Sequence, residues 1–423
     1  MRILVLGSGA REHAIILALR REPTTHEIFA APGNAGIAED ATVVPLDPAD
    51  PAAVTAYAND ANIDLVVIGP EAPLVAGVAD ELRERGIPVF GPGRAAAQLE
   101  GSKAFAKRVM EAAGVPTGRA LRAHTPAELA AALDELGAPY VVKADGLAGG
   151  KGVIVTSERD EAIAHAEQYL GGAPVLVEEY LDGPEVSLFF LSDGDHVLPL
   201  SPAQDYKRLR DGDEGPNTGG MGAYSPLPWL LERFGGEAEF ADLVTRTIAE
   251  PVIRQLDAEG TPFIGLLYAG LVLTAQGVKV IEFNARFGDP ETQVVLPRLV
   301  DPLSELLLAA ASGHLEDLPR PEFAEATAVA VVLASRGYPG APVTGRVLTG
   351  LDAAAAVDGV HLAHAATAHA DEGLVSTGGR VLNVVALGTT FAESTRRAYQ
   401  AIAAIGLEGG QYRTDIAARV VEH

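Results

Sequence analysis

The chain has 423 residues, of which 48% are hydrophobic and 21% charged, and these values indicate a globular protein of roughly two to four domains. Acidic residues outnumber basic residues 57 to 32, for a formal net charge of -25. This balance argues against a nucleic-acid partner, because binding to the phosphate backbone requires a concentrated basic surface. The absence of cysteine excludes disulfides, Cys-ligated metals and thiol catalysis, and it is typical of a reducing compartment.

The N-terminal segment 1–7 is too short and too quickly interrupted for a signal peptide. No uninterrupted apolar stretch reaches the length of a membrane span. We therefore expect a cytoplasmic monomer with small-molecule partners and with neither a membrane nor a nucleic-acid partner.

The first unit, residues 1–101, alternates short apolar runs with helical patterns. Its predicted elements are strands at 3–6, 27–30, 64–68 and 88–90 and helices at 11–20 and 73–85. Apolar strands that alternate with helices predict a parallel sheet covered on both faces. This unit is therefore predicted to be a doubly wound α/β domain.

The second unit, residues 102–325, has a mixed pattern, and several of its strands after residue 185 are predicted to be antiparallel, which is typical of an α+β domain. Its predicted helices are 102–113, 158–170 and 237–257, and its strands are 140–143, 153–156, 175–179, a pair around 185–200, 264–274 and 277–284. The segment 201–226 is predicted to be a long loop, and loops of that length are usually functional or disordered.

The third unit, residues 326–423, is predicted to be a small mixed domain. It has strands at 329–333 and 381–386, joined by glycine-rich turns, and a closing helix at 391–403. The whole chain is thus predicted to be a multidomain protein of α/β and α+β parts.

Three loops follow strands of the first unit, where ligands of open α/β sheets bind. The loop at Gly7 and Gly9 could let backbone N–H groups approach a phosphate at a helix N-terminus, assisted by Arg11. A dinucleotide fingerprint requires a third glycine where this chain has Glu12, so NAD is disfavoured. The alternative is a tight turn without a ligand. The other two loops contain Asn34, Ala35 and Gly36, and Glu71.

A glycine-rich loop between two predicted strands follows Lys143. It differs from a Walker A loop, because Asp145 replaces the first glycine and Gly152 replaces the Ser or Thr that would hold magnesium. A flexible loop of this kind can close over the terminal phosphates of a nucleotide. The alternative is a glycine hairpin with surface lysines.

Two further segments contain carboxylates at strand ends. Residues 178–185 are a candidate hinge whose backbone could pair with an adenine and whose Glu185 could bind ribose hydroxyls, although a plain acidic turn is the more common explanation. Glu282 and Asn284 share one face of a strand and are hard oxygen ligands suited to magnesium. Arg286 could hold a phosphoryl group or a carboxylate bidentately. The alternative is the wet face of an edge strand.

The segment 213–222 has Asn, Thr and several glycines in close succession, which indicates a nest for an anion. The alternative is a disordered surface loop, which Tyr206 and Met221 argue against.

Together these motifs resemble the ATP-grasp ligases and, within them, the glycinamide ribonucleotide synthetase family. The stretches that carry the resemblance are GSGAREHA (7–14), APGNAG (31–36), GPEAPLVAGV (69–78), LEGSKAF (99–105), KADGLAGGKGV (143–153), GPNTGGMGAYSP (215–226) and IEFNARFGDPETQ (281–293). The resemblance covers the whole chain. It implies a pre-ATP-grasp domain (1–101), an ATP-grasp unit (102–325) with a mobile subdomain at about 118–190, and a C-terminal domain (326–423).

The resemblance also implies roles for single residues. ATP is expected at Lys103, Lys143, Gly146, Gly149, Gly150, Lys151, Gly152, Glu178, Leu181 and Glu185. The other substrates are expected at Gly9, Arg11, Asn34, Ala35, Gly36, Glu71, Asp213, Asn217, Thr218, Gly219 and Arg286. Catalysis is expected to involve Arg286, Lys143 and Asn217, and a Mg²⁺ or Mn²⁺ ion is expected at Glu282 and Asn284. The strand before Glu282 lacks an acidic residue, which leaves the ligands of a second metal open.

The reaction implied by the resemblance is ATP-dependent ligation of glycine to 5-phosphoribosylamine in de novo purine biosynthesis. It would pass through glycyl phosphate and give glycinamide ribonucleotide, ADP and phosphate. Such phosphoryl transfer depends on positioning and charge neutralisation. The competing interpretations are another ATP-grasp ligase, an NAD-dependent oxidoreductase and a non-catalytic nucleotide-binding regulator.

Overall fold

The computed structural model describes residues 1–146 and 152–421. The first unit is built on a parallel five-stranded sheet with the strand order β3-β2-β1-β4-β5. In this order the strands are β3 (Thr42–Val43), β2 (Glu27–Pro32), β1 (Arg2–Gly7), β4 (Leu65–Ile68) and β5 (Val89–Phe90). The central strands are buried on both faces, as apolar runs between helices require. The predicted doubly wound α/β fold is confirmed.

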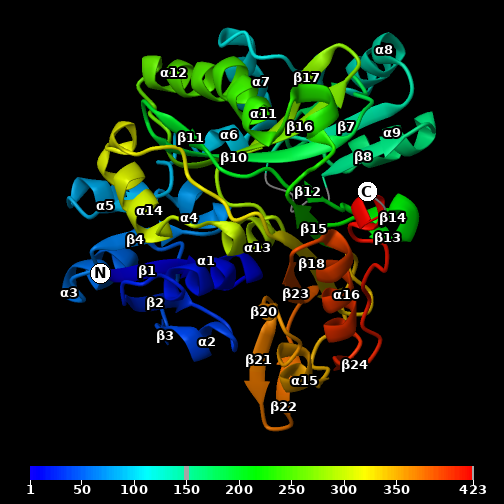
Figure 1. Cartoon of the computed structure of the whole chain (residues 1–423). Coiled ribbons are helices and arrows are strands. Elements are labelled where there is room, and N and C mark those ends of the chain that lie inside the picture. Colours follow the sequence, from blue (N-terminus) through cyan, green and yellow to red (C-terminus); the bar gives the residue numbers. More distant parts are fainter. Residues whose placement is uncertain (147–151, 422–423) are drawn as a thin grey trace.

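Helices lie around this sheet (Figure 1). They are α1 (Ala10–Arg20), α2 (Ile37–Asp40), α3 (Pro51–Asp60), α4 (Glu71–Ala76) and α5 (Val78–Glu84), and α6 (Gln98–Gly101) then leads to α7 (Lys103–Ala112), which packs against α12 (Glu250–Ala258) and β17 (Gly277–Asn284) of the second unit. The prediction of one helix at 73–85 is wrong. Gly77 has a left-handed φ of 86° and separates α4 from α5, and a Cβ there would lie 2.6 Å from the Arg94 side chain.

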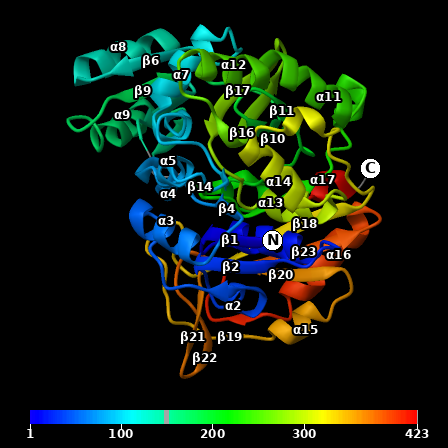
Figure 2. The ribbon, with the colours of Figure 1, turned by 90° about the vertical axis from the view of Figure 1, so that its left-hand side faces the viewer.

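A small antiparallel sheet with two helices projects from the rest of the molecule (Figure 2). Its elements are β6 (Ala120–Ala123), β9 (Val175–Glu178), β7 (Tyr140–Ala144), β8 (Val153–Thr156), α8 (Pro126–Leu136) and α9 (Arg159–Glu167). Leu129, Leu133, Val142 and Val177 belong to a hydrophobic core of its own. This lobe therefore has the packing of a separate subdomain.

A second antiparallel sheet has the order β11-β10-β16-β17. Its strands are β10 (Glu185–Asp193), β11 (Val197–Pro199), β16 (Ile264–Thr274) and β17 (Gly277–Asn284). The helices of this part are α10 (Leu230–Phe234), α11 (Glu237–Val244), α12 (Glu250–Ala258), α13 (Thr292–Val295) and α14 (Leu303–Ser312). The helix predicted at 237–257 is interrupted by a π turn at Thr245–Ala249, next to Pro251, which cannot donate a helical hydrogen bond to residue 247.

The third sheet has the order β12-β15-β18-β23-β20. It joins two strands of the second unit, β12 and β15, to three strands of the C-terminal unit. Its strands are β12 (Gln204–Asp205), β15 (Gly222–Ser225), β18 (Thr327–Ala334), β23 (Arg380–Gly388) and β20 (Val360–His364). The prediction of one long loop at 201–226 is wrong, because this segment contains β12 and β15. It also contains the hairpin formed by β13 (Arg208–Arg210) and β14 (Glu214–Asn217).

The remaining C-terminal elements cover or extend this sheet. They are β19 (Leu348–Thr349), β21 (Thr367–Ala370), β22 (Gly373–Ser376), β24 (Gly406–Leu407), α15 (Leu351–Ala355), α16 (Phe391–Ile402) and α17 (Ala418–Val421). Helix α16 packs on β18 and β23, and this places the predicted closing helix against the predicted strands. No helix in the described part of the chain is long and apolar enough to span a membrane.

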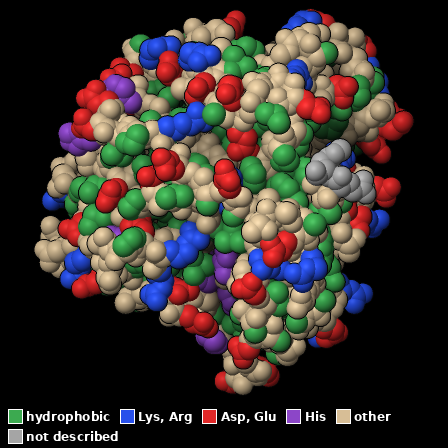
Figure 3. Space-filling view, in the orientation of Figure 1, with side chains coloured by type: hydrophobic (Ala, Val, Ile, Leu, Met, Phe, Trp, Pro, Cys, Tyr) green, Lys and Arg blue, Asp and Glu red, His purple; other side chains and the backbone are tan. Residues whose placement is uncertain are grey.

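The N-terminal and C-terminal units meet along a crease in which histidine side chains gather (Figure 3). The backbone N–H of His364 donates to Nδ1 of His13 at 2.9 Å, and Nε2 of His13 lies 3.1 Å from Oδ2 of Asp40. Because Nδ1 accepts a hydrogen bond, the proton of a neutral His13 must reside on Nε2. This contact fixes the C-terminal unit against helix α1.

Candidate active site

A cavity of about 1020 Å³ lies where the carboxyl edge of the N-terminal sheet meets the other sheets. This is the edge at which open α/β sheets bind ligands. The predicted residues that line the cavity are Gly9, Arg11, Glu71, Lys103, Lys143, Gly146, Gly152, Glu178, Leu181, Glu185, Asp213, Asn217, Thr218, Gly219, Glu282, Asn284 and Arg286. Residues that are far apart in the sequence therefore line the same cavity.

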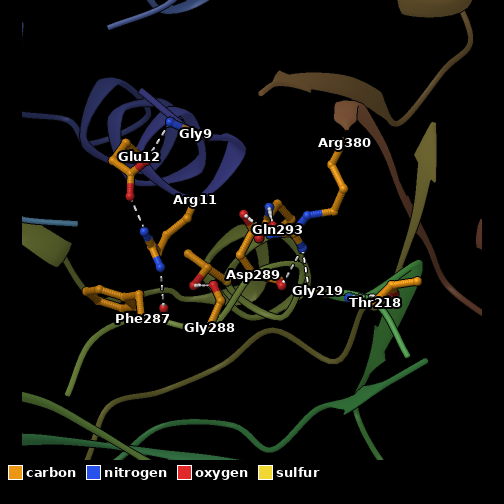
Figure 4. A network of polar contacts seen from close by, with 12 residues as sticks. Gly9, Arg11, Glu12, Thr218, Gly219, Phe287, Gly288, Asp289, Gln293 and Arg380 are labelled. Atoms are coloured by element: carbon orange, nitrogen blue, oxygen red, sulfur yellow. Dashed lines mark hydrogen bonds and ion pairs between the residues drawn. The ribbon is translucent and has the colours of Figure 1, made fainter. Parts of the chain in front are cut away.

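The loop after β1 is filled by the protein's own carboxylate (Figure 4). Glu12 is 1% exposed and accepts hydrogen bonds from Gly9 N and Arg11 Nε, both at 2.6 Å. A Cβ on Gly69 would lie 2.2 Å from Oε1 of Glu12. Glu12 therefore occupies the N-terminus of α1, where a dinucleotide phosphate would bind. The binding of a substrate phosphate by Gly9 and Arg11 stays a prediction.

The second N-terminal loop lies outside the cavity lining. The side-chain amide of Asn34 donates to the carbonyls of Ser8 at 2.9 Å and His364 at 2.8 Å. Ala35 N donates to the Thr367 carbonyl, and Gly36 packs against the ring of His364. These contacts join the loop to the C-terminal unit. A role of Asn34, Ala35 and Gly36 in substrate binding stays a prediction.

The buried Lys143 and the partly buried Lys107 share one carboxylate at the end of the small sheet. Oε2 of Glu178 lies 3.0 Å from Lys107 Nζ and 3.2 Å from Lys143 Nζ. A third lysine, Lys103, donates to the Gly146 carbonyl at 3.1 Å, where the glycine loop begins. Burial lowers the pKa of Lys103, and Glu282 offsets this only in part. The concentration of positive charge is suited to nucleotide phosphates.

Two more residues of the expected ATP site, Leu181 and Glu185, line the same cavity. Glu185 begins β10 and forms an ion pair with Lys207 at 2.7 Å. Gly149, Gly150 and Lys151 lie outside the described residues.

Glu282 and Asn284 offer a carboxylate and an amide carbonyl, which are hard oxygen ligands of the kind that suits magnesium, and metal binding by this pair stays a prediction. They alternate with Phe283 on β17 and both line the cavity. Glu282 has no hydrogen bond or ion pair to another described side chain. Burial acts to raise its pKa, but Lys207 and other nearby cations outweigh burial and hold the pKa below its ordinary value. The described ranges contain no group of three or more His, Cys, Asp or Glu that could hold a metal ion.

Arg286 follows this pair and lies between two carboxylates. Its Nη2 is 3.0 Å from Glu100 Oε1, and its Nε is 3.7 Å from Glu71 Oε2. Burial opposes the charge, but Glu100 and Glu71 outweigh it and raise the pKa of Arg286. Its Nε is buried without a hydrogen-bond partner in the described structure. Arg286 is therefore a rigid cation with an unused donor.

The glycine-rich segment at 217–220 is held by the C-terminal unit. Arg380 donates to the carbonyls of Gly219 at 2.5 Å and Asp289 at 2.8 Å (Figure 4). Gly219 N donates to Tyr338 Oη at 2.8 Å. Thr218 Oγ1 accepts a hydrogen bond from Gly220 N. These contacts argue against a disordered loop, and they already use the N–H groups of Gly219 and Gly220, so the anion nest stays a prediction.

Asp213 lies at the cavity rim and is already paired. Its carboxylate is 2.8 Å from Arg413 Nη1 and 3.3 Å from Arg419 Nη2. The fully buried Arg413 also pairs with Asp415 at 2.6 Å. Asp213 thus anchors the C-terminus to the hairpin β13–β14, and its contact with substrate stays a prediction.

Sequence reasoning assigned no role to several cavity residues. These are Glu100, Lys107, Asp205, Lys207, Glu291 and Arg380. Glu100 and Glu291 lie inside stretches that carry the resemblance, Lys107 follows Lys103 by four residues, and Asp205 and Lys207 are adjacent to Tyr206, so their positions in or beside motifs were a usable signal. No sequence signal pointed to Arg380, because its partners are more than 90 residues away in the sequence.

Fold and cavity together define the class of this protein as an ATP-grasp ligase. Models of the phosphoribosylglycinamide synthetase N domain, ATP-grasp (A) domain and C domain match residues 1–100, 101–292 and 328–419. The chain belongs to the phosphoribosylglycinamide synthetase family.

Individual relatives are similar to this chain over nearly its whole length. The phosphoribosylamine–glycine ligase of Leifsonia xyli is 68% identical over 422 residues, covering 99% of this chain and 100% of that protein. The protein of the same name from Streptomyces coelicolor is 57% identical, with 99% of each chain covered. The crystal structure of the Thermotoga maritima phosphoribosylamine–glycine ligase is 35% identical, with a TM-score of 0.81 and coverage of 98% and 100%.

Proposed function

We propose that this chain joins glycine to 5-phosphoribosylamine, with cleavage of ATP to ADP and phosphate, and so forms glycinamide ribonucleotide in purine biosynthesis. The observation that supports this most strongly is the convergence of Lys103, Lys143, Arg286 and the pair Glu282–Asn284 on one cavity. Whole-length relatives that carry the name of this activity support the choice of substrates.

In the proposed first step, a carboxylate oxygen of glycine attacks the γ-phosphorus of ATP and ADP leaves. The lysines around Glu178 hold the nucleotide phosphates, and Arg286 orients the glycine carboxylate with its planar guanidinium. A Mg²⁺ or Mn²⁺ ion held by Glu282 and Asn284 would neutralise phosphate charge during the transfer.

In the second step, the amine of 5-phosphoribosylamine attacks the carbonyl carbon of glycyl phosphate. The new C–N bond forms, phosphate leaves, and the amine loses a proton. Glu71 and the loop at Gly9 and Arg11 line the cavity from the N-terminal unit, which supports the proposal that they bind the ribose phosphate portion. We propose that the segment from Asn217 to Gly219, which also lines the cavity, binds the acyl phosphate.

The proposed division of the chain follows these roles. Residues 1–101 bind the phosphoribosylamine, residues 102–325 bind ATP and the metal, with a mobile subdomain at about 118–190, and residues 326–423 hold the glycine-rich segment. We further propose that the enzyme acts as a cytoplasmic monomer.

The test measures ADP release with ATP, Mg²⁺, glycine and freshly made 5-phosphoribosylamine, omitting each in turn. The proposal expects ADP only in the complete mixture, together with glycinamide ribonucleotide. ADP formation that depends on a different carboxylate or amine would reject the named substrates.

A further inference from the structure

One peptide group of the loop after β1 is held at both ends by side chains of the N-terminal unit. The carbonyl of Ser8 accepts a hydrogen bond from the side-chain amide of Asn34 at 2.9 Å. The N–H of Gly9, in the same peptide group, donates to Oε2 of Glu12 at 2.6 Å (Figure 4). A planar group that is bound at its carbonyl and at its N–H cannot rotate freely. Both residues of this peptide line the cavity, so the two side chains fix the direction of this part of the cavity wall.

The amide of Asn34 has a second partner, which belongs to the C-terminal unit. Its Nδ2 also donates to the His364 carbonyl at 2.8 Å, and its Oδ1 accepts a hydrogen bond from Ile37 N at 2.9 Å. An asparagine amide has two N–H donors, so both are already used by carbonyls of the protein. Asn34 therefore has the contacts of a residue that positions the loop after β1, rather than those of a residue that binds a substrate.

The two residues that follow this asparagine bind the same part of the C-terminal unit, the turn between β20 and β21. Ala35 N donates to the Thr367 carbonyl at 3.3 Å. A Cβ on the buried Gly36 would lie 2.4 Å from the ring of His364. The backbone N–H of His364 donates in turn to Nδ1 of His13 at 2.9 Å. The turn is thus fixed to the N-terminal unit from several sides, and its carbonyl at His364 is a firm anchor for the asparagine amide.

We propose that Asn34 is a positioning residue that uses the C-terminal unit as a support for the loop after β1, and so sets the affinity for 5-phosphoribosylamine without contacting it. The inference rests on the proposed function, in which this loop binds the ribose phosphate portion. A phosphate at a helix N-terminus is bound by backbone N–H groups with defined directions. Rotation of the Ser8–Gly9 peptide would misalign these donors and weaken the binding of this substrate alone.

The first test is Asn34→Asp in the full-length enzyme. Aspartate keeps the size of the side chain and the oxygen that accepts from Ile37 N, but it replaces the amide donor by an oxygen that repels both carbonyls. We expect the KM for 5-phosphoribosylamine to rise roughly tenfold or more. The KM values for ATP and glycine, and kcat at saturating substrates, should stay within about threefold of the wild-type values. A merely structural role would instead reduce the amount of folded enzyme, which lowers kcat and leaves each KM unchanged.

Asn59→Asp is the matched control, because Asn59 is an exposed asparagine on helix α3 of the same unit. It should retain all three KM values.

A second variant changes the contact from the other side and leaves Asn34 in place. Gly36 has a φ of -72°, which any residue adopts, so Gly36→Ala introduces no backbone strain. Its Cβ would instead push the loop and His364 apart, and this lengthens the hydrogen bond from Asn34 to the His364 carbonyl. We expect the KM for 5-phosphoribosylamine to rise in this variant too, again with the KM values for ATP and glycine retained.

An unchanged KM for 5-phosphoribosylamine in the folded Asn34→Asp enzyme would overturn the inference while leaving the ligase activity intact. An equal rise in the KM values for ATP and glycine would also overturn it, because the effect would then not belong to the loop after β1. An unchanged KM in the folded Gly36→Ala enzyme would overturn the role of the C-terminal unit as the support. A wild-type enzyme that does not use 5-phosphoribosylamine would instead overturn the proposed function and this inference with it.

Discussion

Replacement of Glu178 by glutamine removes the negative charge that the buried Lys143 and the partly buried Lys107 share. The side chains of Glu178 and Lys143 are 6% and 5% exposed, and Lys107 lies 3.0 Å from the same oxygen. Breaking a buried ion pair usually costs about 3–5 kcal/mol. We expect the lower end, about 3 kcal/mol, because Lys143 keeps the Ile281 carbonyl and Lys107 keeps Thr117 and Gly118 as acceptors.

Loss of the Glu178 charge should lower the free energy of unfolding and raise the KM for ATP. Without Glu178 the two ammonium groups repel each other, so Lys143 moves from its position and the KM for ATP rises by roughly tenfold or more. Urea denaturation gives the free energy of unfolding, and steady-state kinetics give the KM. Glu135→Gln is the control, because the Arg119–Glu135 pair is exposed and should contribute less than about 1 kcal/mol. A Glu178→Gln enzyme with the stability and KM of the wild type would refute the reasoning.

Three other changes give separate expectations. Arg286→Lys keeps the charge but loses the fork that faces Glu100, so kcat should fall by roughly 100-fold while the KM for ATP is retained; a kcat near that of the wild type would contradict the role of Arg286. Glu12→Gln weakens the cap on Gly9 and should lower the free energy of unfolding by about 1–2 kcal/mol, and an unchanged denaturation midpoint would count against this. Asp205 has a pKa of about 7 in the folded chain and an ordinary value of 3.8, so the folded state binds more protons between these pH values and stability falls as pH rises. In the ligand-free protein Asp205→Asn should flatten that slope, and an equal slope in both proteins would contradict it.

The regular elements were predictable where one segment contains the whole signal. The strands β16 and β17 have the predicted bounds, because two apolar runs are separated by a turn that ends at Gly277. Segment 201–226 was not predictable as strand. The strands β12 and β15 pair with each other and β15 pairs with β18, so their order depends on a partner about 100 residues later in the sequence.

The residues of the candidate site likewise divide into those that local sequence identifies and those that it does not. Motif residues such as Glu282 and Arg286 were identifiable because their chemistry and spacing are local. The partner of Glu100 was not identifiable, although the residue lies in a motif, since its hydrogen bond from Ala285 N spans 185 residues and no spacing rule encodes it. Asn34 was expected to face a ligand, but its amide is satisfied by carbonyls of Ser8 and His364. Sequence indicates which groups can do chemistry, whereas the fold decides which of them are already paired.

The most direct test of the proposed reaction follows the oxygen atoms of glycine. Glycine labelled with ¹⁸O in both carboxylate oxygens is converted with ATP, Mg²⁺ and 5-phosphoribosylamine, and the phosphate is examined by mass spectrometry. Attack of the carboxylate on the γ-phosphorus predicts that each phosphate contains one ¹⁸O atom and each glycinamide ribonucleotide keeps the other. Phosphate without label would contradict a glycyl phosphate intermediate.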